Sequence, residues 1–467
     1  MEKGRVIVIP NERKISHQMR IEKQKRSDQK MSNNNIKEIP SLGSWFRLPN
    51  LLRLKNSGKC FVNELLKDQD SSVIKVNLSE PTILLCDYDS VKYSYDPRYV
   101  MKEPYFGKSF NPALLGGRLP AMYSNGEDHK VKKQVALEIL NHGIENLSLG
   151  DMSEVIKSEL EAINIEKGDT FEHQIEQVSR SIITKILLGK VLHDSESWRE
   201  WFEKCLDIKF LRFLTFGEDR VLEENLKSIS QTPTVKNLHK IVPESTLLKE
   251  EQILELLHNT NFNGTPALSW VMLSIIARFN DSLSDGERKA IAAEAEEFLR
   301  LDPALYDDKA LAKLDLTEAF LLEVFRYNAP HLLGSYGRAV KDFVIESKTG
   351  KYQVYAGELL TGFVHHVHRD GDVFDEPCKF KLNRDRETAR NKHLAFAGLA
   401  ETEPTAENRK CPGQGILMKA LKIFIAHFTR CTIDFKSDIT YTGKTATRMA
   451  GTDDPIVLKK FVYNKIV

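Results

Sequence analysis

The sequence predicts a mainly α-helical fold with a small β portion on either side of a long helical block. Two observations predict it. From about residue 127 to 330, apolar residues recur at spacings of three and four, as in HKVKKQVALEIL and LTEAFLLEVFRY, which is the period of an amphipathic helix. From 342 to 368 the pattern alternates as in strands, in DFVIES and YQVYAGELLTGFVHH, and Lys348-Thr349-Gly350 supplies the turn.

The flanking segments complete this organisation. Between 55 and 125, short apolar runs such as TILLCDY are broken by Pro and Gly, which is typical of strands and loops. GILMKALKIFIAHF predicts one long apolar helix, and the chain after Thr432 predicts short strands. Because no linker-like stretch follows residue 45, we expect a basic, polar, disordered tail over 1–40 and a single domain over 41–467.

Composition excludes several classes of protein. The net charge of +1 gives no reason to expect a nucleic-acid partner. No run of 18 apolar residues is present, so we expect no transmembrane segment. Six scattered cysteines without a C-x-x-C pattern favour a reducing, cytoplasmic location. Residues 1–30 carry nine Lys or Arg against four acids, which fits a solvated tail and leaves a peripheral membrane contact open.

Cys411 is the cysteine with the most informative neighbours. Pro412 and Gly413 follow it, and an apolar helix starts at once. A helix N-terminus offers N–H donors and partial positive charge, which lower a thiol pKa and favour a thiolate ligand. The alternative is a structural cysteine beside a helix cap, and the other five cysteines are interpreted as small buried residues.

A charged pair lies inside a second apolar helix. Glu323 and Arg326 stand three residues apart in LLEVFRYNAP, and therefore share one helix face. The E-x-x-R pattern occurs elsewhere in this chain in polar surroundings, where it is most simply a solvated pair. A pair in an apolar helix needs further partners, and Arg384 in PCKFKLNRDR is the candidate. These three residues are predicted to form a structural core.

In this order, the motifs resemble the cytochrome P450 superfamily: E-x-x-R, strands, HRDGDVFDEP, KFKLNRD and the Cys loop. The resemblance implies the cytochrome P450 fold, with haem b (iron-protoporphyrin IX) between a kinked distal helix and the proximal Cys loop. It implies Cys411 as the ligand of the iron. GEDHKVKKQV is similar to the family's H-x-x-x-R/K helix, which makes His129 and Lys133 candidates for the haem propionates; a surface histidine is the alternative for His129. Arg338 and Arg409 are further candidates, because a buried dianionic edge requires cations.

The Cys loop is similar to that of one clan within the superfamily. Gly398 precedes Cys411 by thirteen residues, and the extra segment contains EPTAENRKC. SYGRAVKDFVIES and LLGGRLPAMYSNGEDHKVKK also resemble clan motifs. The clan comprises plant allene oxide synthases, hydroperoxide lyases and divinyl ether synthases, with animal epoxyalcohol synthases. We therefore expect an enzyme that acts on fatty-acid hydroperoxides.

The segment LELLHNTNFNGTPALSWVML is expected to be the distal helix. Monooxygenases of the superfamily usually carry an acid before a threonine here, but Gly264 precedes Thr265, and Pro266 favours a kink. Phe262-Asn263 matches the start of the clan's F-N-x-x-G-G, whereas its G-G is absent. Asn263 is the predicted catalytic partner of Cys411, because an amide can donate to or accept from a hydroperoxide. The alternative is an asparagine that satisfies its own helix backbone.

The expected pocket residues are Phe110, Phe262, Gly264 and Thr265, although an ordinary core role is nearly as good an interpretation of Phe110. The expected reaction is homolysis of the O–O bond of a polyunsaturated fatty-acid hydroperoxide, without dioxygen, NADPH or a redox partner. The divergent motifs favour isomerisation to epoxyalcohols. The alternatives are an allene oxide synthase (hydroperoxide dehydratase), a hydroperoxide lyase, a conventional monooxygenase that uses Thr265, and a non-catalytic haem sensor.

Overall fold

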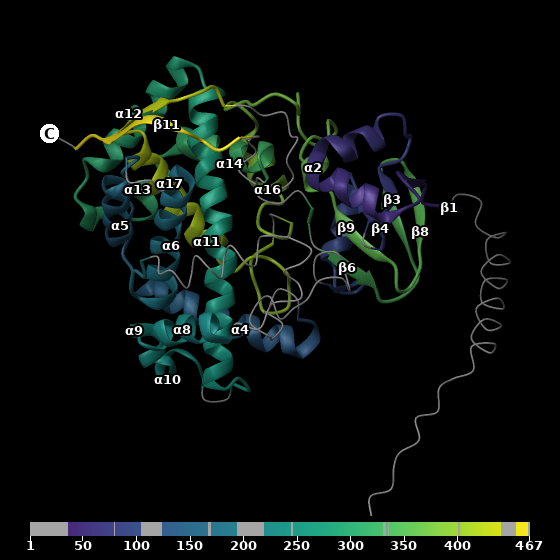
Figure 1. Cartoon of the computed structure of the whole chain (residues 1–467), viewed down its shortest axis with the longest axis horizontal. Helices are drawn as coiled ribbons and strands as arrows, with labels where there is room; N and C mark the ends of the chain where they lie inside the picture. Colours follow the sequence, from purple (N-terminus) through teal and green to yellow (C-terminus); the bar gives the residue numbers. More distant parts are fainter. Residues whose placement is uncertain are drawn as a thin grey trace, which may run out of the picture.

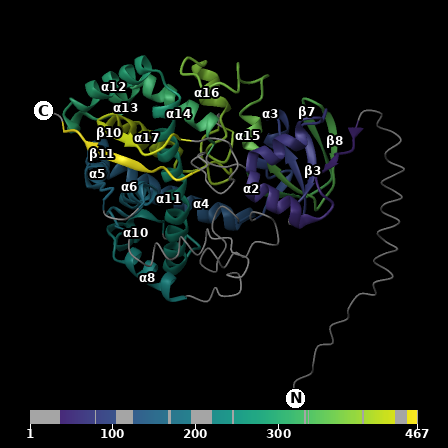
Figure 2. The same ribbon diagram turned by 45° about the horizontal axis from the view of Figure 1, so that its top comes forward.

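A large helical part and a smaller lobe rich in strands make up the molecule (Figures 1 and 2). The computed structural model describes residues 36–78, 80–103, 124–166, 170–193, 219–243, 246–329, 333–334, 336–399, 402–439 and 454–465. The long helix α11 (Glu250–Asp281) runs through the helical part, and the strands β3 (Val73–Asn77), β4 (Pro81–Leu85), β8 (Gly350–Val354) and β9 (Leu359–Gly362) lie in the other lobe. Within the described ranges, no helix is both long and apolar enough to cross a bilayer.

The helical part follows the predicted three- and four-residue periodicity. Its helices are α4 (Gly126–Glu145), α5 (Leu149–Ala162), α6 (Phe171–Leu188), α8 (Asp219–Ser230), α9 (Pro233–Lys236), α10 (Leu238–Ile241), α11 (Glu250–Asp281), α12 (Asp285–Leu299), α13 (Asp308–Ala312), α14 (Asp315–Tyr327), α16 (Arg386–Lys392) and α17 (Gln414–Phe428). Their apolar faces form one continuous core. The predicted helix GILMKALKIFIAHF is α17, and LTEAFLLEVFRY falls in α14.

The helix α11 stays helical through Pro266, so the interruption expected there is not a break in the helix. Its neighbour α6 supports it at this point. The Ser179 hydroxyl donates to the Thr265 carbonyl oxygen (2.6 Å). Gly264 packs against Ile183, since a Cβ at Gly264 would lie 3.3 Å from Ile183 Cδ1. Packing against α6 therefore holds α11 in place although proline removes one backbone hydrogen bond.

Three small sheets complete the fold. The largest has the order β2-β3-β4-β9-β6-β5 and contains β2 (Ser41–Leu42), β3 (Val73–Asn77), β4 (Pro81–Leu85), β9 (Leu359–Gly362), β6 (Tyr336–Ala339) and β5 (Val100–Lys102). The second has the order β1-β8-β7 and contains β1 (Ile36–Lys37), β8 (Gly350–Val354) and β7 (Phe343–Ser347). The third pairs β10 (Cys431–Phe435) with β11 (Leu458–Tyr463). The strands expected from 342 to 368 are thus β7, β8 and β9, followed by the short helix α15 (Val364–Val367).

Two boundaries differ from the prediction. Strands and loops were expected from residue 55, but 55–66 belong to the helix α2 (Arg47–Leu66). Gly58, with φ +41°, kinks this helix, and the kink interrupts the helical period on which the prediction depended. Within the segment expected as a tail, residues 36–37 form β1, which pairs in parallel with β8. The rest of the predicted tail, residues 1–35, lies outside the described residues.

The buried ion pairs of α14 join it to the segment after α15. Glu323 and Arg326 are both 2% exposed at the side chain and lie 2.6 Å apart, and Arg384 binds the same carboxylate at 3.0 Å. Arg326 also donates to three carbonyl oxygens, those of His368, Pro377 and Lys379. Every charge in the network has several partners, which is the condition for a stable buried ion pair.

Replacing Arg326 by alanine removes this pairing and takes the guanidinium donor from the carbonyl oxygens of His368 and Pro377, whereas the Lys379 carbonyl oxygen keeps Arg384 as a donor. We expect the free energy of unfolding to fall by about 3–5 kcal/mol. Arg300→Ala is the matched control, because Arg300 ends α12, is 70% exposed and binds Glu296 at 3.1 Å. That change should cost less than about 1 kcal/mol. Denaturant unfolding of the full chain measures both, and equal losses would contradict a structural role for the network.

Candidate active site

Cys411 lies where its loop meets the first turn of α17. Its backbone N–H donates to the Phe396 carbonyl oxygen (2.9 Å), and the Gly413 N–H donates to the sulfur. Burial raises the pKa of the Cys411 thiol, whereas the Gly413 N–H and the charges of Lys133 and Lys410 lower it. A backbone donor and two cations thus favour a thiolate at a position where burial alone favours the neutral thiol.

A buried histidine connects this loop to the ion-pair network. His368 lies 3.0 Å from the Arg326 carbonyl oxygen through Nδ1, and its Nε2 accepts the Leu394 N–H at 2.8 Å. Burial holds the pKa of His368 well below its usual value, so the ring is neutral and carries its proton on Nδ1. Phe396, which accepts from Cys411, packs edge-on against Phe325 of α14 (5.1 Å between ring centroids). The position of the thiol therefore depends on α14.

The structure brings His129, Lys133 and Arg409 together. Lys133 donates to the Asn408 side-chain oxygen (3.0 Å), and His129 Nε2 lies 3.2 Å from the Asn408 carbonyl oxygen. Arg409 contacts His129 Nδ1 (3.0 Å) and donates to the Asn125 side-chain oxygen (2.8 Å). These contacts join the start of α4 to the two residues that precede Lys410 and Cys411.

Lys133 and Arg409 of this cluster donate to neutral oxygen atoms. Burial lowers the pKa of Lys133 to about 8 and that of Arg409 to about 10. In the part of the chain that the structure describes, neither side chain forms an ion pair with a carboxylate. Buried cations whose partners are neutral oxygens would be stabilised by an anionic ligand.

Lys102 is a further cation that the sequence analysis missed. It ends β5, and Asn125 bonds both its N–H (2.7 Å) and its carbonyl oxygen (3.0 Å). Burial, with the charge of Arg409 acting in the same direction, lowers the pKa of Lys102 to about 7. No motif surrounds this lysine in the sequence, so only the fold could place it beside Arg409.

Arg338 does not join these cations. Its guanidinium binds Glu80 and Glu103, each at 2.9 Å, and donates to the Gly357 carbonyl oxygen (2.9 Å). Two carboxylates already compensate its charge, so the structure gives no support to Arg338 as a propionate ligand.

One face of α11 is less tightly covered than the rest of the helix. Its half-buried positions recur every three or four residues, at Thr260, Asn263, Gly264, Ala267 and Trp270. The Asn263 side-chain nitrogen donates to the Asn259 carbonyl oxygen (2.7 Å), which is the self-satisfying contact considered as its alternative role. The second N–H and the oxygen of this amide make no hydrogen bond within the described ranges. One turn earlier, the buried Asn259 has a side-chain oxygen that finds no hydrogen-bond partner among the described residues. The sequence analysis also missed this second amide.

The other pocket candidates lie differently. Thr265 is 1% exposed, and its hydroxyl donates to the Asn261 side-chain oxygen (3.2 Å). Gly264, although half-buried, packs toward α6, and Phe262 is buried in the protein. Phe110 lies outside the described residues. Among the candidates on α11, Asn263 is therefore the side chain best placed to meet a ligand.

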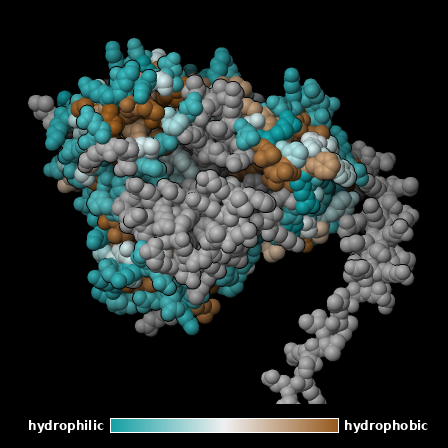
Figure 3. All heavy atoms as spheres, in the orientation of Figure 1, coloured by the Kyte–Doolittle hydropathy of each residue, from teal (hydrophilic) through white to brown (hydrophobic). Residues whose placement is uncertain are grey.

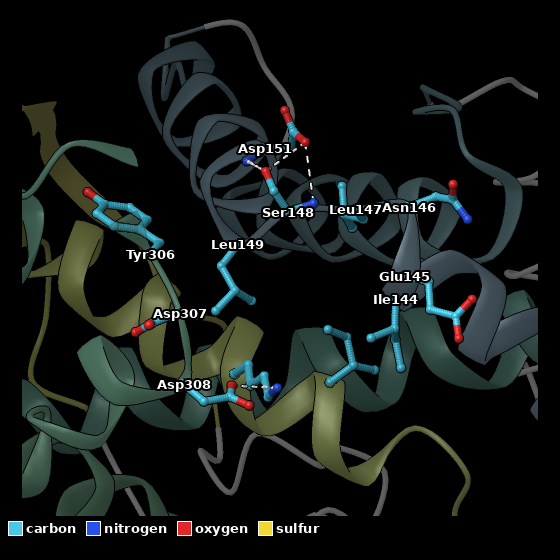
Figure 4. A pocket seen from close by; sticks show the side chains of 12 residues that line it. Ile144, Glu145, Asn146, Leu147, Ser148, Leu149, Asp151, Tyr306, Asp307 and Asp308 are labelled. Atoms are coloured by element: carbon cyan, nitrogen blue, oxygen red, sulfur yellow. Dashed lines mark hydrogen bonds and ion pairs between the residues drawn. The ribbon is translucent and has the colours of Figure 1, made fainter. Parts of the chain in front are cut away.

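Figure 4 shows a cavity of about 530 Å³ elsewhere in the molecule. It lies between the α4–α5 turn, the segment from Tyr306 to Asp308 and the first turns of α17, where Asp308 and Lys419 form an ion pair (2.6 Å). None of the predicted site residues lines it. No residue of α11 lines this cavity, so it is separate from the half-buried face of that helix.

The comparisons with known proteins identify the fold. Residues 219–431 match the family model described as cytochrome P450. The chain contains a cytochrome P450 domain. Retinoic acid-bound cyanobacterial CYP120A1 superposes with a TM-score of 0.66 over 88% of this chain and 96% of that structure, at 15% sequence identity. The fold is therefore the cytochrome P450 fold, as the sequence predicted.

Two curated plant proteins are similar to this chain at low identity. The chloroplastic fatty acid hydroperoxide lyase of Solanum lycopersicum is 24% identical over 208 residues, which is 44% of this chain and 44% of the lyase. A divinyl ether synthase of Allium sativum is 26% identical over 403 residues, which is 77% of this chain and 83% of the synthase. The match thus spans less than half of the lyase but most of the synthase.

The cofactor of this domain is haem, and the residues present fit it. Cys411 offers a sulfur with a backbone donor, and Lys133 and Arg409 offer positive charge whose hydrogen-bond partners within the described residues are neutral. Asn263 stands on a half-buried helix face with part of its amide unused. Sulfur, cations and an open polar face are the three features that a thiolate-ligated haem with propionates requires.

We expect Lys133→Gln to loosen the cofactor, because it removes a charge that can pair with a propionate. Haem transfer to apomyoglobin should become about tenfold faster, which corresponds to one charge-assisted hydrogen bond. Lys130→Gln is the matched control, since Lys130 lies on the same helix, is 49% exposed and contacts Glu407 at 3.5 Å. Equal rates of haem transfer from the two variants would contradict a role for Lys133 in binding haem.

Proposed function

We propose that this enzyme splits the O–O bond of polyunsaturated fatty-acid hydroperoxides. The observation that carries the proposal is Asn263, a half-buried amide on the open face of α11 at a place where no acid accompanies Thr265. The printed names of the two plant relatives support it, because one is a fatty acid hydroperoxide lyase and the other a divinyl ether synthase.

Each proposed site residue has a role in this chemistry. Haem with a cysteine thiolate ligand favours cleavage of the O–O bond when it is bound. Cys411 supplies the thiolate, and the Gly413 N–H and nearby cations stabilise its charge. His129, Lys133 and Arg409 hold the propionates. The remaining N–H and oxygen of the Asn263 amide bind and orient the hydroperoxide.

The contacts of Thr265 argue against a role for its hydroxyl in the proton delivery that a conventional monooxygenase requires. Dioxygen activation requires protons, which a superfamily monooxygenase usually delivers through an acid and an alcohol. Here Thr265 is 1% exposed, its hydroxyl is bonded to Asn261, and its carbonyl oxygen accepts from Ser179 of α6. A peroxide substrate already contains both oxygen atoms at the required oxidation level. The proposal therefore includes no redox partner and no NADPH, and it retains the cytoplasmic location indicated by the cysteine usage.

The expected product is an epoxyalcohol. After O–O homolysis, the substrate alkoxyl radical closes on the neighbouring double bond, and return of the hydroxyl group gives the epoxyalcohol with both oxygens retained. Loss of a proton and an electron would give an allene oxide, and chain cleavage would give a lyase product. These branches differ by packing near the radical, where one methylene is worth about 1–3 kcal/mol. The absent G-G after Asn263 favours the epoxyalcohol branch over the allene oxide branch of plants.

Stopped-flow mixing of the haem-loaded protein with linoleate 9- and 13-hydroperoxides tests this function. We expect rapid loss of the conjugated-diene absorbance under argon and without NADPH, and epoxyalcohols as the products in mass spectrometry. Ketols from an allene oxide, or short-chain aldehydes, would instead assign one of the other two branches. Turnover that requires a reductase, NADPH and dioxygen would contradict the proposal, and a sensor would show no turnover at all.

Asn263→Ala should slow hydroperoxide turnover by roughly 10²–10³-fold, the usual effect of removing one polar group that acts in the transition state. The haem spectrum should stay unchanged, because Asn263 is not a haem ligand. Thr265→Val is the informative comparison. A conventional monooxygenase would lose activity with this change, whereas we expect hydroperoxide turnover within a few-fold of the unaltered enzyme at equal haem content. Unchanged kinetics in Asn263→Ala would remove Asn263 from the mechanism.

A further inference from the structure

Lys410, the residue directly before Cys411, is a buried lysine. On the face that Figure 3 draws, hydrophilic side chains cover much of the outer surface, which is where lysines usually lie. Lys410, by contrast, is 2% exposed, although burial of an ammonium group costs free energy. A charge that the fold buries directly beside the proposed haem ligand is therefore expected to act on that ligand.

The Lys410 side chain is held in one place. Its Nζ donates to the Leu399 carbonyl oxygen (2.7 Å), and its backbone N–H donates to the Asn408 side-chain oxygen (3.1 Å). Its aliphatic stem packs on Gly398, where a Cβ would lie 3.3 Å from Lys410 Cδ and 3.5 Å from Lys410 Cα. Contacts with both ends of the Cys loop thus fix the position of the ammonium group.

The turn beneath Lys410 has an unusual backbone. Ala397 has φ +55°, a left-handed conformation that is unfavourable for a residue with a Cβ. It lies between Phe396, whose carbonyl oxygen accepts the Cys411 N–H (2.9 Å), and the segment that ends in the Leu399 acceptor of Lys410. Such a conformation persists where the surrounding structure requires it. One turn therefore supplies the acceptors for both the ligand backbone and the ammonium group.

The charge of Lys410 acts on two buried groups. Burial raises the pKa of the Cys411 thiol, and the charge of Lys410 is one of the causes that lower it. Burial lowers the pKa of His393 to about 3, and the charge of Lys410 acts in the same direction. His393 stacks on Phe325 of α14 (5.8 Å between ring centroids), inside the protein. Because buried charges are poorly screened, the ammonium group influences the interior around the proposed ligand.

We propose that Lys410 is a positioning residue that acts through Cys411, and that its fixed charge withdraws electron density from the thiolate and raises the reduction potential of the bound haem. Reduction adds one negative charge to the thiolate-ligated iron, and a nearby buried cation favours the more negative state. This inference concerns the haem-loaded protein and does not depend on the proposed function. One consequence does depend on it: homolysis shares the bonding electron pair between the two oxygen atoms, and so requires less donation from the thiolate than heterolysis does.

A spectroscopic redox titration of the full-length, haem-loaded protein tests the proposal. Lys410→Met removes the charge and keeps an unbranched side chain. It should make the ferrous state at least about tenfold less favoured, a shift of about 59 mV to more negative potential for one electron. The reduced carbon monoxide complex should keep its red-shifted Soret band, because Cys411 is still the ligand. Lys410→Arg keeps the charge and should stay closer to the potential of the unaltered protein.

Lys419→Met is the matched control. Lys419 lies on α17, its side chain is 33% exposed, and Asp308 compensates its charge at 2.6 Å, so the potential should change less than about twofold in the same equilibrium. An unchanged potential in Lys410→Met, or equal shifts in the two variants, would overturn the proposal. If Lys410→Met fails to bind haem through the thiolate, Lys410→Gln decides by the same criteria, because its amide can still donate to the Leu399 carbonyl oxygen without a charge.

The outcome for Lys410 is independent of the outcome for the proposed function. A shifted potential in a protein that does not turn over hydroperoxides would support the role of Lys410 and reject the proposed function. Hydroperoxide turnover with an unshifted potential in Lys410→Met would do the reverse.

Discussion

The pairing of Glu323 with two arginines is the interaction on which the arrangement of the site depends. The side chains of Glu323, Arg326 and Arg384 are buried. Their charges are therefore stabilised by one another and by the carbonyl oxygens to which the arginines donate. Through Arg326 this network reaches His368, and the neutral ring of His368 holds the chain that leads to Phe396 and Cys411. A thiol that must stay beside a helix N-terminus is thus positioned by charges in a different helix.

The same loop is joined to a second helix, α4, by a cluster of cations. Lys133 and His129 of α4 bind Asn408, and Arg409 binds back to His129. The loop is therefore clamped between α14 on one side and α4 on the other. This explains how a loop in which Gly398 precedes Cys411 by thirteen residues can still present one sulfur in a fixed place. The lengthened segment adds contacts to α4 rather than freedom to Cys411.

Much of this could be predicted from the sequence, for reasons that differ between residues. Glu323, Arg326 and Arg384 were predictable because a charged pair in an apolar helix demands a partner. Lys102 and Asn259 were not, because a lone lysine after a strand or an asparagine in a helix has no local signature of what the fold brings beside it. Arg338 was a propionate candidate because a buried dianionic edge requires cations, whereas its position between Glu80 and Glu103 depends on strand pairing. The start of α2 escaped prediction because Gly58 breaks its helical period.

The central claim is that Cys411 binds the haem iron as a thiolate, and the absorption spectrum of the reduced protein with carbon monoxide tests it most directly. We predict the strongly red-shifted Soret band that a thiolate ligand produces. Cys411→Ser should lose that band, whereas Cys431→Ser, which changes a half-buried cysteine just after α17, should keep it. A spectrum without the red-shifted band in the unaltered protein, or its survival in Cys411→Ser, would contradict the account.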